Sequence, residues 1–142
     1  MKFFIILVLV TVVFAATTPQ KYKDAYELYK NKNYEESVIL FNELINEDND
    51  DFYSGNAYYW LGMIDYNSKK YQESVLKFLK VLTCKNEWKY ADAMLKIANC
   101  YERLDMNDKA MIYYDEILKL KTKNEKLVSD QVLEIAKSKK GE

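Results

Sequence analysis

The stretch YYWLGMIDYNSKKYQESVLKFLKVL, residues 58–82, decides the fold. Its apolar residues recur every three or four places on both sides of a polar NSKK segment, which is the spacing of one face of an α-helix. The sequence therefore predicts two helices joined by a short turn. Gly62 stands inside the first of them, although glycine destabilises a helix interior by about 1 kcal/mol relative to alanine.

The same arrangement recurs before and after this stretch. Each unit has a small residue in a first helix (helix A), a second small residue twelve places later in a second helix (helix B), and an aromatic residue four places after that. The three sets are Ala25, Ser37 and Phe41; Gly62, Ser74 and Phe78; and Ala98, Ala110 and Tyr114. Successive units are offset by 37 and then 36 residues in both helices. A period of this length is typical of stacked helical repeats, and the small residues mark where helix A backs closely onto helix B.

The periodic segments predict helices over residues 20–31, 34–47, 53–67, 71–84, 88–103 and 107–121, which form repeats 18–51, 52–87 and 88–123. A seventh helix over 125–139 has one apolar face and no partner after it, so we expect it to cap the array. Asn33, with Glu36 three places later, has the pattern of a capping box for the second helix. We expect Gly62→Leu to destabilise the protein through overpacking and Gly62→Ala to be mild.

The composition favours one all-α domain. The 142 residues include three Gly and one Pro, which are too few turn-formers for a many-stranded sheet protein. The formal charge is −1 and no basic stripe is present, so a nucleic-acid partner is disfavoured.

The first residues, MKFFIILVLVTVVFAA, have an early lysine, a long apolar run and small residues after it. This is the anatomy of a secretory signal peptide, and we expect residues 1–15 to be removed after Ala15. The apolar core is shorter than the roughly 20 residues that cross a bilayer, and an uncleaved N-terminal membrane anchor is the alternative. No Cys follows the cleavage region, so lipid anchoring is not expected. The sequence thus predicts an exported domain of residues 16–142, periplasmic or secreted.

The sequence offers little for catalysis. With no His in the chain, Ser-His-Asp and Cys-His mechanisms are excluded, and no CxxC pair suggests a metal site. Asp115 and Glu116 are neighbours on a helix and so point in different directions. The acidic stretch NEDNDD, residues 46–51, lacks the Gly and the distal Glu of a calcium loop. We expect no enzymatic activity, no cofactor and no bound metal. Cys84 and Cys100 lie on apolar helical faces, which favours two free thiols over a disulfide.

These repeats resemble the tetratricopeptide repeat family. Against the family pattern W-x2-L-G-x2-Y, A-x3-F and Pro, the second unit has Tyr58, Leu61, Gly62, Ser74 and Phe78, and the third has Ile97, Ala98, Tyr101, Ala110 and Tyr114. The second unit departs from the pattern at Asp65 and Asn86. The resemblance covers nearly all of the expected mature chain. It implies a right-handed superhelical array of three hairpins with a capping helix, which binds protein partners.

The second and third units are also similar to the C-terminal repeat domain of the periplasmic Tol-Pal system protein family, YbgF/CpoB. They share its longer unit, its A-x-L-K-x-x-x-C-Y helix and its trailing helix. This resemblance implies partners in the cell-envelope machinery and a role in coordinating outer-membrane constriction with wall synthesis. The family usually has an N-terminal coiled coil, whereas residues 17–20 here lead directly into repeats. Outer-membrane assembly lipoproteins such as BamD have similar repeats, but the lipidated Cys is missing here.

The predicted binding surface is the face of each helix A that turns away from helix B, which lines a concave groove in stacked repeats. Its residues are Tyr22, Tyr26, Tyr29 and Lys30 in the first unit, Tyr59, Met63, Tyr66 and Asn67 in the second, and Leu95, Asn99, Glu102 and Arg103 in the third. Tyr and Met suit a peptide or a partner helix, because they supply contact area while the phenol still hydrogen-bonds. The alternative is that several of these tyrosines only pack between helices.

Other ligands fit this stripe less well. Some tetratricopeptide proteins hold a terminal carboxylate with Lys and Asn at places that Tyr22, Tyr26, Tyr59 and Met63 occupy here, so that ligand is not expected. A self-associating structural role is a second hypothesis. Binding of a cell-wall polymer, with tyrosines stacked on sugar rings, is a third.

Overall fold

The computed structural model describes residues 17–48 and 51–141, and within them the secondary structure is entirely helical. The seven α-helices are α1 (Thr18–Lys30), α2 (Tyr34–Glu47), α3 (Phe52–Asn67), α4 (Tyr71–Val81), α5 (Tyr90–Arg103), α6 (Asn107–Lys123) and α7 (Asp130–Lys140). Short 3-10 turns, η1 (Glu87–Lys89) and η2 (Glu125–Leu127), precede α5 and α7. The predicted signal peptide lies outside the described residues. None of the helices described here has the length and apolarity of a membrane span.

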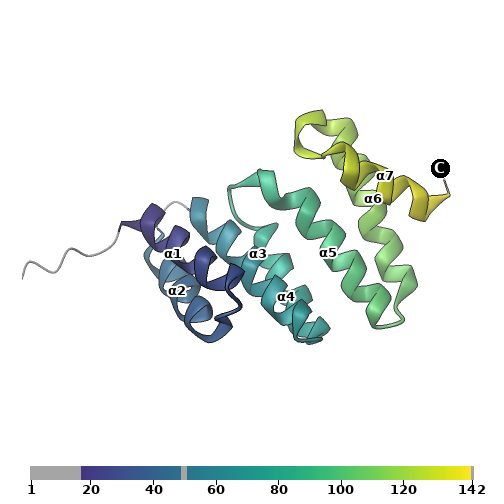
Figure 1. Ribbon diagram of the computed structural model, residues 1–142. Helices are drawn as coiled ribbons and strands as arrows, with labels where there is room; N and C mark the ends of the chain where they lie inside the picture. Colours follow the sequence, from purple (N-terminus) through teal and green to yellow (C-terminus); the bar gives the residue numbers. More distant parts are fainter. Residues whose placement is uncertain (1–16, 49–50, 142) are drawn as a thin grey trace, which may run out of the picture.

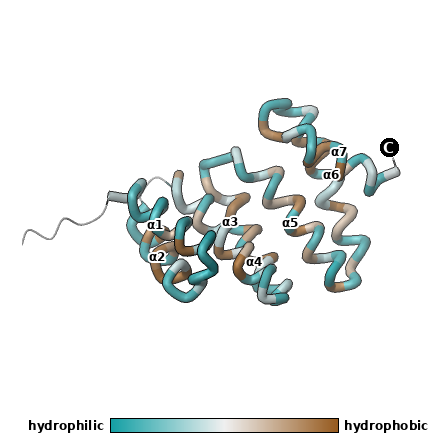
Figure 2. Tube along the Cα trace, viewed as in Figure 1, coloured by the Kyte–Doolittle hydropathy of each residue, from teal (hydrophilic) through white to brown (hydrophobic). Residues whose placement is uncertain are grey.

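The helices form three antiparallel hairpins and a final helix, as the repeat pattern predicts. Helix α1 packs on α2, α3 on α4, and α5 on α6, while α2 meets α3 and α4 meets α5 between hairpins. Helix α7 packs on α6 and closes the last hairpin (Figure 1). Apolar and polar stretches alternate along each helix in Figure 2, as expected when one face of each helix is buried. The predicted all-α array with a capping helix is confirmed.

Two predicted helices differ from the structure by more than two residues at one end. Helix α4 stops at Val81 rather than residue 84, because Leu82, Thr83 and Cys84 donate to carbonyls three residues earlier and so form a tighter turn. The capping helix starts at Asp130 rather than residue 125. The Ser129 hydroxyl accepts a hydrogen bond from the Val132 N–H at 3.4 Å and caps this helix.

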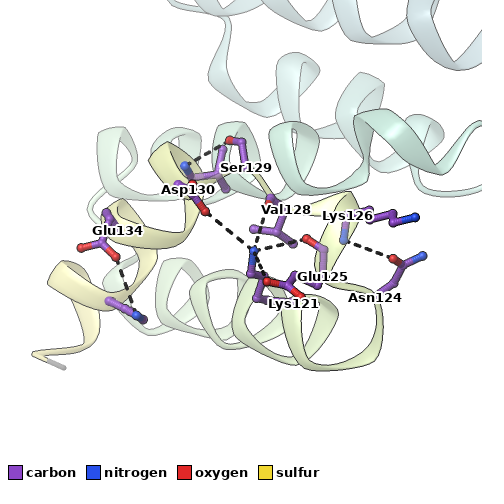
Figure 3. Close-up of polar contacts among 10 residues, drawn as sticks. Lys121, Asn124, Glu125, Lys126, Val128, Ser129, Asp130 and Glu134 are labelled. Carbon is purple, nitrogen blue, oxygen red and sulfur yellow. Dashed lines mark hydrogen bonds and ion pairs between the residues drawn. The ribbon is translucent and has the colours of Figure 1, made fainter.

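Lys121 holds the segment between α6 and the capping helix (Figure 3). Its ammonium donates to the carbonyl oxygens of Glu125 at 3.2 Å and Val128 at 3.3 Å, and Asp130 Oδ1 lies 3.9 Å away. Asn124 accepts a hydrogen bond from the Lys126 N–H at 3.2 Å within the same turn. These contacts satisfy carbonyls that no helix uses, and they fix where α7 begins.

The small residues lie where the two helices of a hairpin touch. Ser37 Oγ donates to the carbonyl oxygen of Ala25 at 2.9 Å, and Ser74 Oγ donates to that of Gly62 at 2.8 Å. All four residues are buried. In the third hairpin Ala110 stands in the place of the serine and has no hydroxyl to donate. The aromatic residues that follow these positions, Phe41, Phe78 and Tyr114, are fully buried.

Gly62 is under a tighter constraint than the sequence suggests. A Cβ built on it would lie 2.9 Å from Cε1 and 3.0 Å from Cδ1 of Phe78, whose ring is fully buried. Such contacts are too short, so even alanine would force the ring or the helices to move. The expectation of a mild Gly62→Ala is therefore wrong, because the repeat pattern shows that a small residue is needed but not where the ring lies.

The turns inside the three hairpins share one backbone geometry. Lys32, Lys69 and Asp105 have positive φ angles of 64°, 60° and 57°. In each turn the next N–H donates to a carbonyl five residues earlier, at distances of 2.9, 2.9 and 2.8 Å. This is the Schellman ending of a helix, which usually employs glycine at the positive φ.

The predicted capping box at Asn33 is wrong, because the Schellman turn already uses the backbone N–H that the box requires. The Asn33 N–H already donates to the Leu28 carbonyl at 2.9 Å in the Schellman turn, so it is not free for Glu36. The Asn33 side chain makes no capping hydrogen bond either.

Both cysteines are buried free thiols, in agreement with their expected packing role. Burial raises the pKa of each thiol. The Cys100 thiol donates to Ser74 Oγ at 3.4 Å and so joins the contact between α3 and α4.

Candidate partner-binding face

The predicted stripe lies on α1, α3 and α5, and we call this surface the A-helix face. Most of its side chains are half-buried, while Lys30, Asn67 and Arg103 are exposed. The half-buried members are Tyr22, Tyr26, Tyr29, Met63, Tyr66, Leu95, Asn99 and Glu102. The exposed and half-buried members thus keep part of their surface accessible to solvent.

Aromatic rings concentrate at the end of this face formed by α1 and α3. Tyr26 stacks near Tyr22 and Tyr29, with ring centroids 6.4 and 6.3 Å apart. Trp60 lies against both Tyr26 and Tyr29, with centroid distances of 4.8 Å each. Its indole N–H donates to the Tyr22 hydroxyl at 3.0 Å, which joins the first two hairpins. We call Tyr22, Tyr26, Tyr29 and Trp60 the aromatic cluster.

Trp60 is absent from the predicted stripe. It stands one residue after Tyr59, and a helical step of one residue turns a side chain by about 100°. The helical spacing of the predicted stripe therefore assigns Tyr59 to the surface and leaves Trp60 out. The signal in the sequence that could have identified Trp60 is the indole itself, because its N–H needs a hydrogen-bond acceptor when the side chain is half-buried, and tyrosine hydroxyls on the preceding helix A can supply one.

Tyr59 itself is only 8% exposed and packs inside the array. Its ring lies 5.5 Å from the Phe78 ring, and the Lys89 ammonium sits 4.9 Å above it. Burial raises the pKa of its hydroxyl. Tyr59 therefore packs between helices, which was the alternative for the stripe tyrosines, and we leave it out of the proposed surface.

The other end of the face, formed by α3 and α5, is charged. Lys96 lies 5.5 Å from the centroid of the Tyr66 ring, and the Tyr66 hydroxyl beside Arg103 raises the pKa of that guanidinium. Glu102 pairs with Lys139 at 2.8 Å, which ties α5 to the capping helix. The face therefore passes from a cluster of aromatic rings to charged side chains of both signs along the array.

The neighbouring acidic residues Asp115 and Glu116 on α6 each form an ion pair. Asp115 pairs with Lys140 at 2.7 Å, and Glu116 pairs with Lys119 at 2.6 Å. Among residues 17–48 and 51–141, no group of three or more Cys, Asp or Glu residues could hold a metal ion. Residues 49 and 50 of the acidic stretch lie outside the described residues.

A shallow hollow lies away from this face, between the start of α3 and the turns η1 and η2. Its volume is about 680 Å³, and Trp88 and Phe52 at its rim are 66% and 51% exposed. Asn86 and Asn124 each accept a backbone hydrogen bond two residues on, in equivalent turns. The lining mixes polar and apolar groups.

Comparisons with known proteins agree with the fold. Residues 92–120, the third hairpin, match a family model described as tetratricopeptide repeat. The N-terminal domain of stress-induced protein-1 (STI-1) from C. elegans superposes with a TM-score of 0.68 at 16% sequence identity, covering 87% of this chain and 94% of that chain. No curated protein sequence matches the chain. The described residues thus form tetratricopeptide-like helical hairpins with a capping helix.

Proposed function

We propose that this tetratricopeptide repeat domain is a non-catalytic adaptor that holds a segment of a protein partner on the A-helix face. The observation that carries the proposal is the aromatic cluster, which continues into the half-buried Met63 and Tyr66 on α3. Large rings that keep part of their surface exposed supply contact area at a low cost in side-chain entropy. The Trp60–Tyr22 hydrogen bond holds them in place before a partner arrives.

Crosslinking tests this role. A photo-reactive amino acid at Tyr26 or Met63 should crosslink one protein partner from the native extract. The same group at Gln131, which is exposed on the capping helix, is the control. Equal crosslinking from all three positions would contradict the proposal. Tyr59 is unsuitable for this test, because its replacement would disturb the packing described above.

We further propose that the domain is exported to the cell envelope and binds partners in the Tol-Pal or division machinery there. The apolar N-terminal sequence with small residues after it and the YbgF/CpoB-like second and third units support this proposal. Expression with residues 1–15 should yield a periplasmic or secreted product whose mass lacks that segment. A product of full mass that sediments with membranes would favour the N-terminal anchor instead.

A further inference from the structure

A row of exposed apolar residues runs across the outer side of the B helices. Ile39 on α2 is 57% exposed, Leu76 on α4 is 63% exposed, and Ile112 on α6 is 57% exposed. Each stands two residues after the small residue of its helix, so it points about 200° away from the helix contact. We call these three residues the outer row.

Packing within the array does not account for this row. Single exposed apolar residues are ordinary on protein surfaces. Here the same register is apolar in all three hairpins, with the repeat offsets of 37 and 36 residues. At a position that faces water, many polar residues have a helix propensity as good as that of Ile or Leu, so helix formation does not require an apolar residue there. A surface that presents apolar groups at regular intervals suits an apolar face of another molecule.

A hollow beside Leu76 would receive an apolar side chain. Its volume is about 260 Å³, and it lies between α4 and the turn from α5 to α6. Its lining is largely apolar and consists of Val75, Leu76, Tyr101, Leu104, Met106 and Lys109, with Gln72 at the edge. Met106, at 43% exposure, extends the apolar surface from Leu76 toward α6.

Acidic groups accompany each member of the row. Glu35 and Glu36 stand four and three residues before Ile39, Glu73 stands three before Leu76, and Asp108 stands four before Ile112. All four are exposed, and none has an ion-pair partner among the described residues. Acidic residues in a first turn favour the helix dipole. Exposed lysines also stand near two members of the row, Lys80 four residues after Leu76 and Lys109 three before Ile112. The excess of negative charge is therefore greatest beside Ile39, because α2 contains no basic residue.

We propose that the outer row docks a basic amphipathic segment of a protein partner, with apolar side chains on the row and Lys or Arg beside the acidic groups. Opposite charges around an apolar contact speed association and select the partner. Two copies of this chain are poor partners for each other through α2, because that helix contains acidic residues and no basic one. This surface is separate from the A-helix face.

The probe for this proposal is a fluorescent helical peptide of Leu and Lys, with a Leu and Glu peptide of the same pattern as its counterpart. The purified protein should bind the Lys peptide, and Leu76→Ser or Ile112→Ser should weaken binding about tenfold each. Glu36→Lys with Glu73→Lys should weaken it as well. Phe52→Ser, which removes a similarly exposed apolar residue elsewhere, is the control and should bind as the wild type does.

Circular dichroism establishes that each variant is folded. We expect this for the outer-row, glutamate and Phe52 variants because the side chains that they replace are exposed. The proposal is overturned if the Lys peptide does not bind, if it binds the outer-row variants as it binds the wild type, or if the Glu peptide binds equally well. A doubling of the protein's mass in solution that Leu76→Ser abolishes would assign the row to self-association and would also overturn it. Loss of binding in Tyr26→Ala alone would assign the peptide to the A-helix face.

Discussion

Ser74 Oγ donates a 2.8 Å hydrogen bond to the carbonyl oxygen of Gly62 at the point where α4 crosses α3. Ser37 and Ala25 make the same contact in the first hairpin at 2.9 Å. Residues twelve places apart in the sequence thus touch in the structure. In these two hairpins the buried serine hydroxyl is satisfied by a backbone carbonyl of the partner helix.

Ser74→Ala should lower the free energy of unfolding by about 1 kcal/mol, because it removes this buried hydrogen bond and the acceptor of the Cys100 thiol. Chemical denaturation measures the change. Ser138→Ala, at an exposed position on α7, is the control and should be neutral. An equal effect of both substitutions would show that the buried bond adds nothing.

Gly62→Ala should destabilise the protein by about 1–3 kcal/mol, since the new methyl group would press on the Phe78 ring. A double-mutant cycle with Phe78→Leu checks the cause. The smaller side chain leaves room for the methyl group, so the double variant should be more stable than the two single effects predict. Strict additivity would mean that the ring is not what excludes alanine.

Lys69→Gly should stabilise the protein by about 0.5–1 kcal/mol, because its φ of 60° strains every residue except glycine. Thermal or urea denaturation detects a change of this size. Lys70→Gly is the matched control, since its φ is −86° and the flexibility of glycine should there lower stability. The idea fails if the two variants shift the midpoint in the same direction.

Tyr114→Phe should make the protein more resistant to alkali. Burial, with Glu102 as a lesser cause, raises the pKa of the Tyr114 hydroxyl in the folded state above the value of about 10 in the unfolded chain. The stability that depends on the neutral phenol is therefore complete below about pH 10 and is lost as the pH rises toward the folded pKa.

Urea denaturation at pH 7 and pH 11 measures this effect. The phenylalanine variant should lose less stability between the two values than the wild type. At pH 7 it should be as stable as the wild type, because the Tyr114 hydroxyl makes no hydrogen bond among the described residues. Equal alkaline losses in both proteins would contradict the role assigned to Tyr114.

The sequence predicts only part of the A-helix face. The predicted stripe includes Tyr26, Met63 and Tyr66, which are half-buried on the A helices. It also included Tyr59, which Phe78 and Lys89 cover, and missed Trp60, which reaches Tyr22 on the previous hairpin. Where these two side chains lie depends on how far one helix is rotated against the next, which spacing within a single helix does not encode.

The sequence by itself determined the helices, their pairing and the positions of close contact. Helix periodicity and the twelve-residue relation are local along the chain, so Gly62, Ser74 and Phe78 could be placed in register without coordinates. Only the tertiary structure decided that the Phe78 ring excludes a methyl group at Gly62, and that the turn at Lys32 engages the Asn33 N–H. Those outcomes depend on distances of a few tenths of an ångström between segments that only the packed fold brings together.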